Sequence, residues 1–174
     1  MSSSSNTDYS LQSTTNKSRR KTNINCLQLN VQHSRTATPN LTQVVLQYNI
    51  DIAFVEEPYT ILNKVAGFPK IFRIFAHDSN TKRSAIIVNN NEADVTAITQ
   101  VSHEGVILTE IRIEDLTFYG TSLYLPIDRD IEGDLETIED ILQLTRGEGL
   151  ILTIDGNARI NCGPIRAQIP GKEH

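Results

Sequence analysis

The chain has 174 residues, is 39% hydrophobic and carries a formal net charge of −5, which suits one globular domain with its own core. No run of 18 apolar residues and no secretory leader are visible, so we expect an intracellular protein without membrane contact. Cys26 and Cys162 show neither metal-site spacing nor a disulfide framework. They are predicted to be free thiols in a reducing compartment.

Residues 1–22 are rich in Ser, Thr and Asn, and this composition predicts a disordered tail. The tail contains four cations and one carboxylate, namely Lys17, Arg19, Arg20, Lys21 and Asp8. This cluster has three open interpretations: a nuclear localisation signal, an arm that binds nucleic acid, or a solvated tail. The tail contributes +3 and the remainder therefore −8, which argues against a general nucleic-acid coat protein. An enzyme that gathers carboxylates around a metal ion tolerates such a charge.

The next segments predict a strand–helix–strand unit. Residues 24–30 (INCLQLN) and 51–57 (DIAFVEE) each have the pattern of a buried strand. Between them, Thr38 is the expected N-cap and Pro39 the first residue of a helix that Asn49 ends. One face of this helix carries the apolar residues Leu41, Val44, Val45 and Tyr48. Two parallel strands joined by a right-handed crossover are expected.

The middle of the chain predicts an antiparallel sheet of short strands separated by polar turns. Its strand candidates are residues 70–76, 84–90, 94–99, 106–113 and 117–125. Residues 130–149 then show helical spacing of apolar residues, with Gly147 as a stop signal. A further buried strand is expected at 149–155. The order of elements predicts an α/β protein in which sheets are covered by helices.

Polar residues stand where several predicted strands end: Asn30, Glu57, Tyr124 and Asp155, with Asn157 two residues further on. In layered α/β folds, the strand ends line the ligand crevice. Oxygen donors without a nearby Cys or His cluster suit Mg²⁺ or Mn²⁺ and hence phosphoryl chemistry. Each residue also has a purely structural interpretation, because polar residues often end strands and Asp-Gly-Asn is an ordinary turn sequence.

The segments LQLNVQHSR, EEPY, SAIIV, YLP and DGNAR resemble, in this order, the endonuclease/exonuclease/phosphatase superfamily. More narrowly, the chain is similar to the apurinic-type endonuclease domain of non-LTR (LINE-type) retrotransposons over roughly residues 24–160. The resemblance implies a DNase I-like fold, a two-layer β-sandwich flanked by helices. It also implies a DNA substrate, which is nicked to expose a 3′-hydroxyl for target-primed reverse transcription. His33 and Arg35 belong to the HSR motif and are further candidates.

The same resemblance assigns roles to matching residues. Glu57 takes the position of the metal-binding glutamate, for Mg²⁺ or Mn²⁺, and Asn30 that of the asparagine that helps to hold this site. Tyr124 matches the tyrosine that hydrogen-bonds the scissile phosphate. Asp155 matches the aspartate that orients or deprotonates the attacking water, and Asn157 matches the asparagine that contacts the phosphate in the transition state. These roles agree with what in-line attack on a phosphodiester requires.

The sequence also departs from the family pattern. Gln32 and Ile154 stand where Asp or Asn and Gly are usual, and the chain contains no Trp. No segment matches the second aspartate or the Ser/Thr-Asp-His motif, whose histidine acts on the scissile phosphate. We therefore expect a partial domain at 23–160 that lacks its C-terminal strands, an irregular tail at 161–174, and weak or absent activity. The alternatives are a phosphatase of the same superfamily, a non-catalytic binding module that retains the fold, or an unrelated α/β domain. Nothing in the sequence indicates an obligate protein partner.

Overall fold

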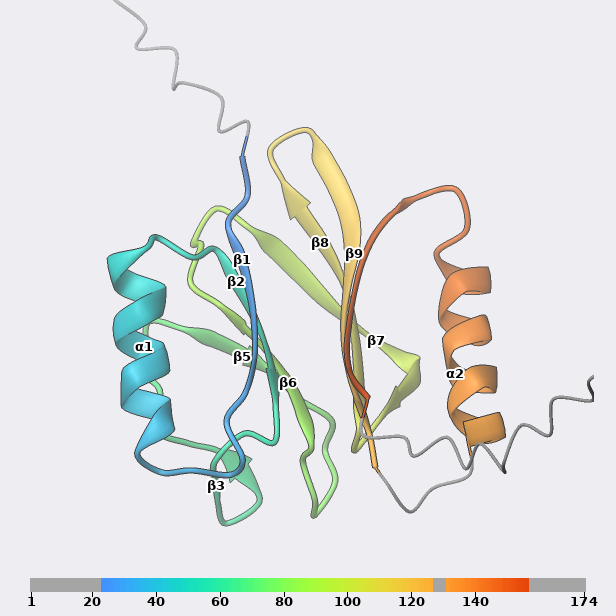
Figure 1. The fold of residues 1–174 in the computed structure, drawn as a ribbon. Helices are drawn as coiled ribbons and strands as arrows, with labels where there is room; N and C mark the ends of the chain where they lie inside the picture. Colours follow the sequence, from blue (N-terminus) through green and yellow to red (C-terminus); the bar gives the residue numbers. More distant parts are fainter. Residues whose placement is uncertain (1–22, 127–130, 157–174) are drawn as a thin grey trace, which may run out of the picture.

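Two β-sheets face each other in this computed structural model, which describes residues 23–126 and 131–156, and each sheet carries one helix on its outer face (Figure 1). The first sheet has the order β1 (Cys26–Asn30), β2 (Ile52–Glu56), β6 (Ser84–Val88), β5 (Arg73–Phe75). The second has the order β10 (Gly149–Gly156), β9 (Leu116–Leu125), β8 (Val106–Ile113), β7 (Asp94–His103). The helices are α1 (Ala37–Gln47) and α2 (Ile131–Leu144). This arrangement confirms the two-layer sandwich with flanking helices.

The strand pairing follows the sequence patterns closely. Strands β1 and β2 pair in parallel and are connected by α1. Strands β9 and β10 also pair in parallel and are connected by α2. The remaining neighbours in both sheets are antiparallel, as predicted for the middle of the chain. One described element was not predicted, a short hairpin formed by β3 (Thr60–Ile61) and β4 (Lys64–Val65). Its strands have two residues each, which is too short for a periodic pattern.

The start of α1 differs from the prediction. The helix begins at Ala37, so Thr38 is not the N-cap and Pro39 is not the first helical residue. The hydroxyl of Ser34 accepts a hydrogen bond from the Ala37 N–H at 3.2 Å, and the Thr38 hydroxyl donates to the Ser34 carbonyl at 3.2 Å. Thr38 is fully buried. The N-cap position is Thr36, whose side chain makes no capping hydrogen bond. The Ser34 hydroxyl instead satisfies the free N–H group of the first helical residue.

The end of α1 agrees with the prediction. Asn49 has a left-handed backbone with φ +49°. Its N–H donates to the Leu46 carbonyl, and the next N–H, from Ile50, donates to the Val45 carbonyl at 2.9 Å. This pair of bonds is a Schellman motif, and Asn tolerates the left-handed conformation that the motif requires.

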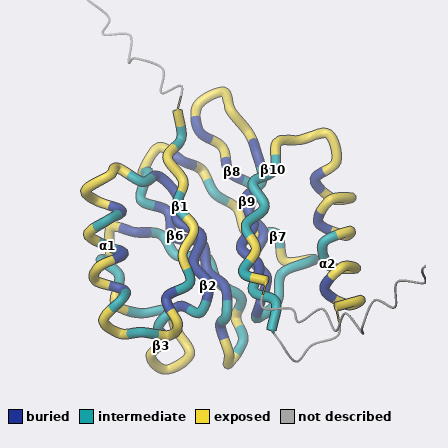
Figure 2. The backbone as a smooth tube through the Cα atoms, in the orientation of Figure 1, coloured by how far each residue is buried: buried dark blue, intermediate teal, exposed yellow. Residues whose placement is uncertain are grey.

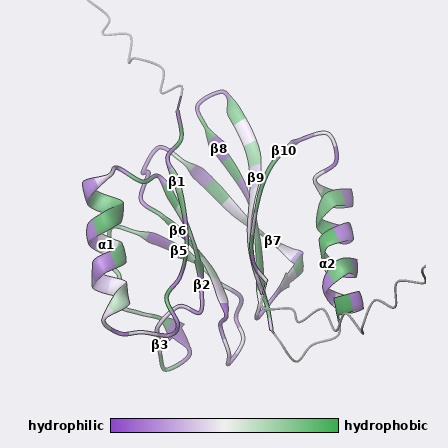
Figure 3. Cartoon of the chain, in the orientation of Figure 1, coloured by the Kyte–Doolittle hydropathy of each residue, from purple (hydrophilic) through white to green (hydrophobic). Residues whose placement is uncertain are grey.

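The main core lies between the sheets, and Figures 2 and 3 show that the facing strands are mostly buried and hydrophobic. This core consists largely of alternate strand residues. Its largest members are Ile52, Phe54, Ile86, Ile107, Ile111 and Phe118. The intervening residues of the same strands point outward. Ala53 and Val55 of β2 pack under α1, while Val106 and Leu108 of β8 pack with Ile141 of α2. Burial on both faces explains why β2 and β6 have continuous apolar sequences.

Strands β1 and β10 are not the buried strands that their sequences predicted. Each is the last strand of its sheet, and Leu29 and Ile154 are 41% and 39% exposed. An apolar run predicts that a segment forms a strand, but it does not show whether the strand pairs with another strand on both edges. Cys26 on β1 is an exposed free thiol, as predicted, and Cys162 lies outside the described residues. Neither described helix is long and apolar enough to cross a membrane.

Replacement of Gly120 by Ala should destabilise the sandwich by about 1–3 kcal/mol, because it overpacks the core. A Cβ at Gly120 would lie 2.9 Å from Ile111 Cδ1 and 3.0 Å from Phe54 Cε1. Gly133→Ala in α2 is the matched control, since its Cβ would meet nothing within 4 Å; it should stabilise the helix by up to about 1 kcal/mol. Urea unfolding measures both. A Gly120→Ala variant as stable as the wild type would contradict the packing described.

Candidate active site

Asn30 links two carboxylates that come from different sheets. β1 and β2 are parallel and in register at Asn30 and Glu56, so both strands end at the same edge. The Asn30 amide nitrogen donates to Glu57 Oε2 at 3.2 Å and also to Asp155 Oδ2, at the end of β10. The amide oxygen accepts from the Gln32 N–H at 2.7 Å, which turns the NH₂ group toward the carboxylates.

The backbone holds Glu57 in an uncommon conformation. Glu57 has φ +47°, and a non-glycine residue adopts this region only where its surroundings enforce it. The Glu57 N–H donates to the Arg83 carbonyl at 2.7 Å, and its carbonyl accepts from the His33 N–H at 2.7 Å. These bonds fix the side chain, which is 18% exposed, at the accessible end of the sandwich.

Two basic side chains face the Glu57 carboxylate. Arg83 Nη1 and His33 Nε2 each lie 3.7 Å from Oε1, and His33 Nδ1 lies 3.1 Å from the Pro58 carbonyl oxygen. The Arg83 guanidinium also lies over the Tyr124 ring, 5.1 Å from its centroid, a distance typical of a cation–π contact. Arg83 was not among the residues that the sequence singled out. It directly precedes the SAIIV segment, which contributed to the family resemblance but offered no polar candidate.

Tyr124 completes the set of strand-end residues near Glu57. Its N–H donates to the Gly105 carbonyl at 2.8 Å, which anchors the end of β9. Burial raises the pKa of the Tyr124 hydroxyl, and the hydrogen bond and charge of Glu57 raise it further, against a smaller lowering by Arg83. The hydroxyl is therefore a neutral hydrogen-bond donor at the mouth of the site.

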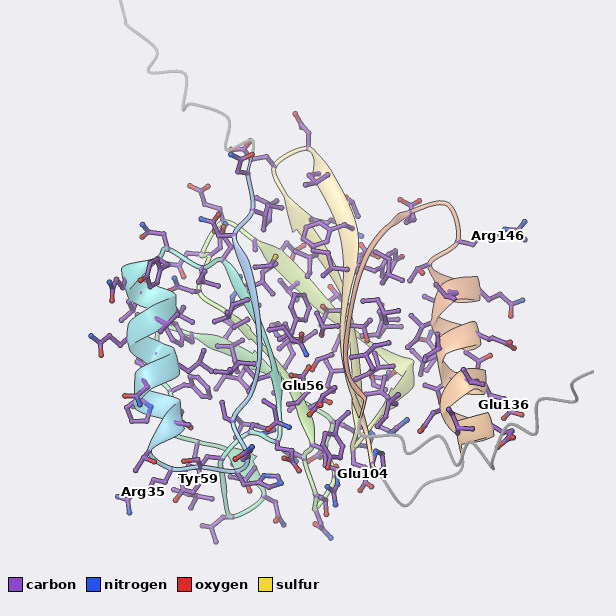
Figure 4. All side chains as sticks on the ribbon, in the orientation of Figure 1. Arg35, Glu56, Tyr59, Glu104, Glu136 and Arg146 are labelled. Atoms are coloured by element: carbon purple, nitrogen blue, oxygen red, sulfur yellow. The ribbon has the colours of Figure 1, made fainter. Side chains whose placement is uncertain are left out.

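Glu56, the residue before Glu57, lies between the two sheets (Figure 4). It is 0% exposed. Its Oε1 accepts from the Ser122 hydroxyl at 3.1 Å and its Oε2 from the Gln28 amide at 3.5 Å. Burial raises the pKa of Glu56 to about 7; these two hydrogen bonds lower it, and the nearby charge of Asp155 raises it. The sequence offered no signal that separates this buried acid from its neighbour Glu57.

The structure therefore brings together Asn30, His33, Glu57, Tyr124 and Asp155 among the residues that the sequence singled out. Figure 4 shows Arg35 beside the start of α1, with its side chain directed away from the space between the sheets. Asn157 lies outside the described residues.

A hard divalent cation suits this donor set. The described residues contain no group of three or more His, Cys, Asp or Glu side chains placed to hold a metal ion. They do offer two carboxylates, Glu57 and Asp155, joined by the Asn30 amide. Mg²⁺ is commonly held by one or two carboxylates, while water and substrate phosphates complete its shell. Zn²⁺ prefers a closed set of nitrogen and sulfur ligands, so the described donors fit Mg²⁺ or Mn²⁺ better.

Comparison with known proteins agrees with this geometry. The endonuclease domain of TRAS1, a telomere-specific non-LTR retrotransposon, is 26% identical at a TM-score of 0.70, over 79% of this chain and 61% of that domain. Two further structures share the fold. A D. rerio TDP2 complexed with single-strand DNA product is 13% identical (TM-score 0.58, 79% and 62% covered), and the human Nocturnin catalytic domain is 14% identical (TM-score 0.54, 78% and 64% covered).

The chain spans about three fifths of the length of these solved structures. No protein-family model and no curated protein matches its sequence. The fold, the ordered strand-end motifs and the likeness to the TRAS1 domain nevertheless agree with one another. The chain belongs to the endonuclease/exonuclease/phosphatase superfamily.

Proposed function

We propose that this chain carries the metal and phosphate site of a DNA endonuclease that hydrolyses one phosphodiester bond with Mg²⁺ or Mn²⁺. The observation that carries the proposal is the Asn30 amide bridging the Glu57 and Asp155 carboxylates, with Tyr124 and Arg83 beside them. The likeness to the TRAS1 endonuclease domain supports nicking of DNA for target-primed reverse transcription. The related fold of a TDP2 seen with a DNA product is compatible with a DNA substrate.

Each described side chain has a role that its surroundings support. Glu57, oriented by the Asn30 amide, would hold the metal ion, which supplies charge neutralisation at the phosphate oxygens. The protonated Tyr124 hydroxyl would donate a hydrogen bond to a phosphate oxygen, and the Arg83 guanidinium would add positive charge beside it. Asp155, oriented by the Asn30 amide, would accept the proton of the attacking water. The predicted role of Asn157 in contacting the phosphate stays a prediction.

We expect nicking by the 174-residue chain to be slow. The sequence has no match to the Ser/Thr-Asp-His motif, whose histidine acts on the scissile phosphate in the family. General acid–base groups typically contribute 10²–10⁴-fold to such reactions, so loss of one leaves a weak but measurable rate. Supercoiled plasmid is a suitable substrate, because one nick in several thousand bonds converts a molecule to the open-circular form.

The test is plasmid nicking in Mg²⁺, in EDTA and with Asp155→Asn, with release of phosphate from a small phosphomonoester measured in parallel. We expect open-circular DNA in Mg²⁺, none in EDTA, and a rate at least ~100-fold lower for Asp155→Asn. Monoester hydrolysis without nicking would support a phosphatase instead. Stabilisation by Mg²⁺ without turnover of either substrate would support a non-catalytic binding module.

A further inference from the structure

The β3–β4 hairpin begins two residues after Pro58 and lies at the site end of the sandwich (Figures 1 and 4). Its turn consists of Leu62 and Asn63, between the pairs Thr60–Val65 and Ile61–Lys64. Leu62 is 90% exposed and Ile61 is 52% exposed. The most exposed apolar side chain among the large hydrophobic residues of the described chain is thus presented next to the candidate active site.

Leu62 is also the wrong residue for its backbone. Leu62 and Asn63 have φ +49° and +60°, the combination of a tight hairpin turn that favours Asn, Asp and Gly. Asn63 fits this preference. Leu62 does not, because a γ-branched side chain gains nothing locally from the left-handed conformation that Asn stabilises through its polar group. Leu62 thus has an unfavourable backbone conformation and an exposed apolar side chain, and neither stabilises the hairpin. This combination indicates a role in binding rather than in folding.

The hairpin holds Leu62 in place. The Asn63 side-chain amide donates to Asn80 Oδ1 at 3.1 Å, and the Ala66 N–H donates to the Tyr59 carbonyl at 2.9 Å. His33, which faces Glu57, is tied to the Pro58 carbonyl at the base of the hairpin. The tip is therefore positioned relative to the site before any ligand binds, which lowers the entropic cost of a contact.

The segment that contains the hairpin is basic although the whole chain is acidic. Residues 58–83 hold five cations and one carboxylate, a net of +4, in a chain whose net charge is −5. The cations are Lys64, Lys70, Arg73, Lys82 and Arg83, and the carboxylate is Asp78. Lys64 and Lys70 are exposed. An apolar tip on a basic segment is complementary to a duplex, in which bases lie between two phosphate backbones.

We propose that the β3–β4 hairpin is a DNA wedge, in which Leu62 inserts against a base step in the minor groove while Lys64 contacts the backbone. This inference rests on the proposed DNA substrate. Insertion of Leu between base steps is an established way to unstack and kink a duplex. Leu62 lies four positions along the chain from Pro58, roughly 13 Å of extended chain, so the unstacked step should lie within about four nucleotides of the phosphate held beside Glu57.

The test uses the full chain and a set of 20-base-pair duplexes, each with one 2-aminopurine at a different position, so that no site preference needs to be known. Fluorescence reports unstacking, and anisotropy of a labelled duplex reports binding; neither needs catalysis. The wild type should raise 2-aminopurine fluorescence at one or two adjacent positions. Leu62→Asn should abolish the rise and weaken binding roughly tenfold. Asn suits the left-handed turn, so its melting temperature should be unchanged or higher.

Leu116→Ala is the matched control. Leu116 is a 51% exposed leucine at the turn between β8 and β9, and it lies eight strand residues, roughly 27 Å, from Tyr124. It should bind and unstack like the wild type. Equal unstacking by wild type and Leu62→Asn would overturn the wedge even if the plasmid is nicked. Unstacking that depends on Leu62 without any nicking would uphold the wedge and overturn the endonuclease. Absence of duplex binding would overturn both.

Discussion

Glu57→Gln is expected to remove the stabilisation that Mg²⁺ gives the protein and to lower plasmid nicking at least ~100-fold. A cation at ten times its dissociation constant stabilises the folded chain by about 1.4 kcal/mol, which corresponds to roughly 3–5 °C in melting temperature for a domain of this size. Glu57 is the carboxylate that Asn30, His33 and Arg83 all face. Glutamine keeps its size and its hydrogen bond from Asn30 but removes its charge.

The change in melting temperature that Mg²⁺ causes distinguishes a metal site from a structural ion pair. If Glu57 serves only to balance Arg83 and His33, Glu57→Gln will lower the melting temperature equally with Mg²⁺ and with EDTA. Glu92→Gln is the matched control: Glu92 is an exposed carboxylate near the opposite end of the first sheet, and its Mg²⁺ response should equal that of the wild type. An undiminished Mg²⁺ shift in Glu57→Gln would show that this carboxylate does not hold the ion.

Glu56→Gln is expected to stabilise the protein at pH 8 and to have little effect at pH 5. Burial raises the pKa of Glu56 from 4.5 to about 7, so the fold favours the protonated acid. The stability from this group is fully present below pH 4.5 and is lost as the pH rises through 7. The loss amounts to roughly 3 kcal/mol at 1.36 kcal/mol per pH unit. Glutamine cannot ionise, yet it offers the Ser122 hydroxyl an acceptor of the same shape.

The measurement is urea unfolding of both proteins from pH 5 to pH 8, compared as a difference so that other titrating groups cancel. Glu136→Gln serves as the control, because Glu136 is exposed on α2 and points to solvent (Figure 4). It removes a carboxylate without relieving any burial, so it should not reproduce the gain in stability expected for Glu56→Gln at pH 8. A Glu56→Gln protein that loses stability at pH 8 would mean that the ionised carboxylate is the form that the fold requires.

Arg83 and Glu56 show why part of the site was not predictable. Glu56 is the last residue of β2 and Arg83 directly precedes β6. In the sequence, both resemble the solvated polar residues that commonly end strands. Arg83 belongs to the site because its guanidinium faces the Glu57 carboxylate and the Tyr124 ring. Glu56 is distinguished by its burial and by the hydrogen bond that it accepts from Ser122, 66 residues away. These contacts join segments that are far apart in the sequence, and the hydrophobic periodicity of one segment does not show which distant segment it will contact.

The sequence by itself determined the type of most elements and the set of polar residues at the strand ends. Continuous apolar runs predict that β2 and β6 are buried on both faces, and parallel pairing places Asn30 and Glu57 at one edge. Only the tertiary structure decided that β1 and β10 are edge strands and that Asn30 meets Asp155 across 125 residues. The physical reason is that local patterns report burial and hydrogen-bonding type, whereas sheet order and the facing of two sheets depend on which distant surfaces pack together.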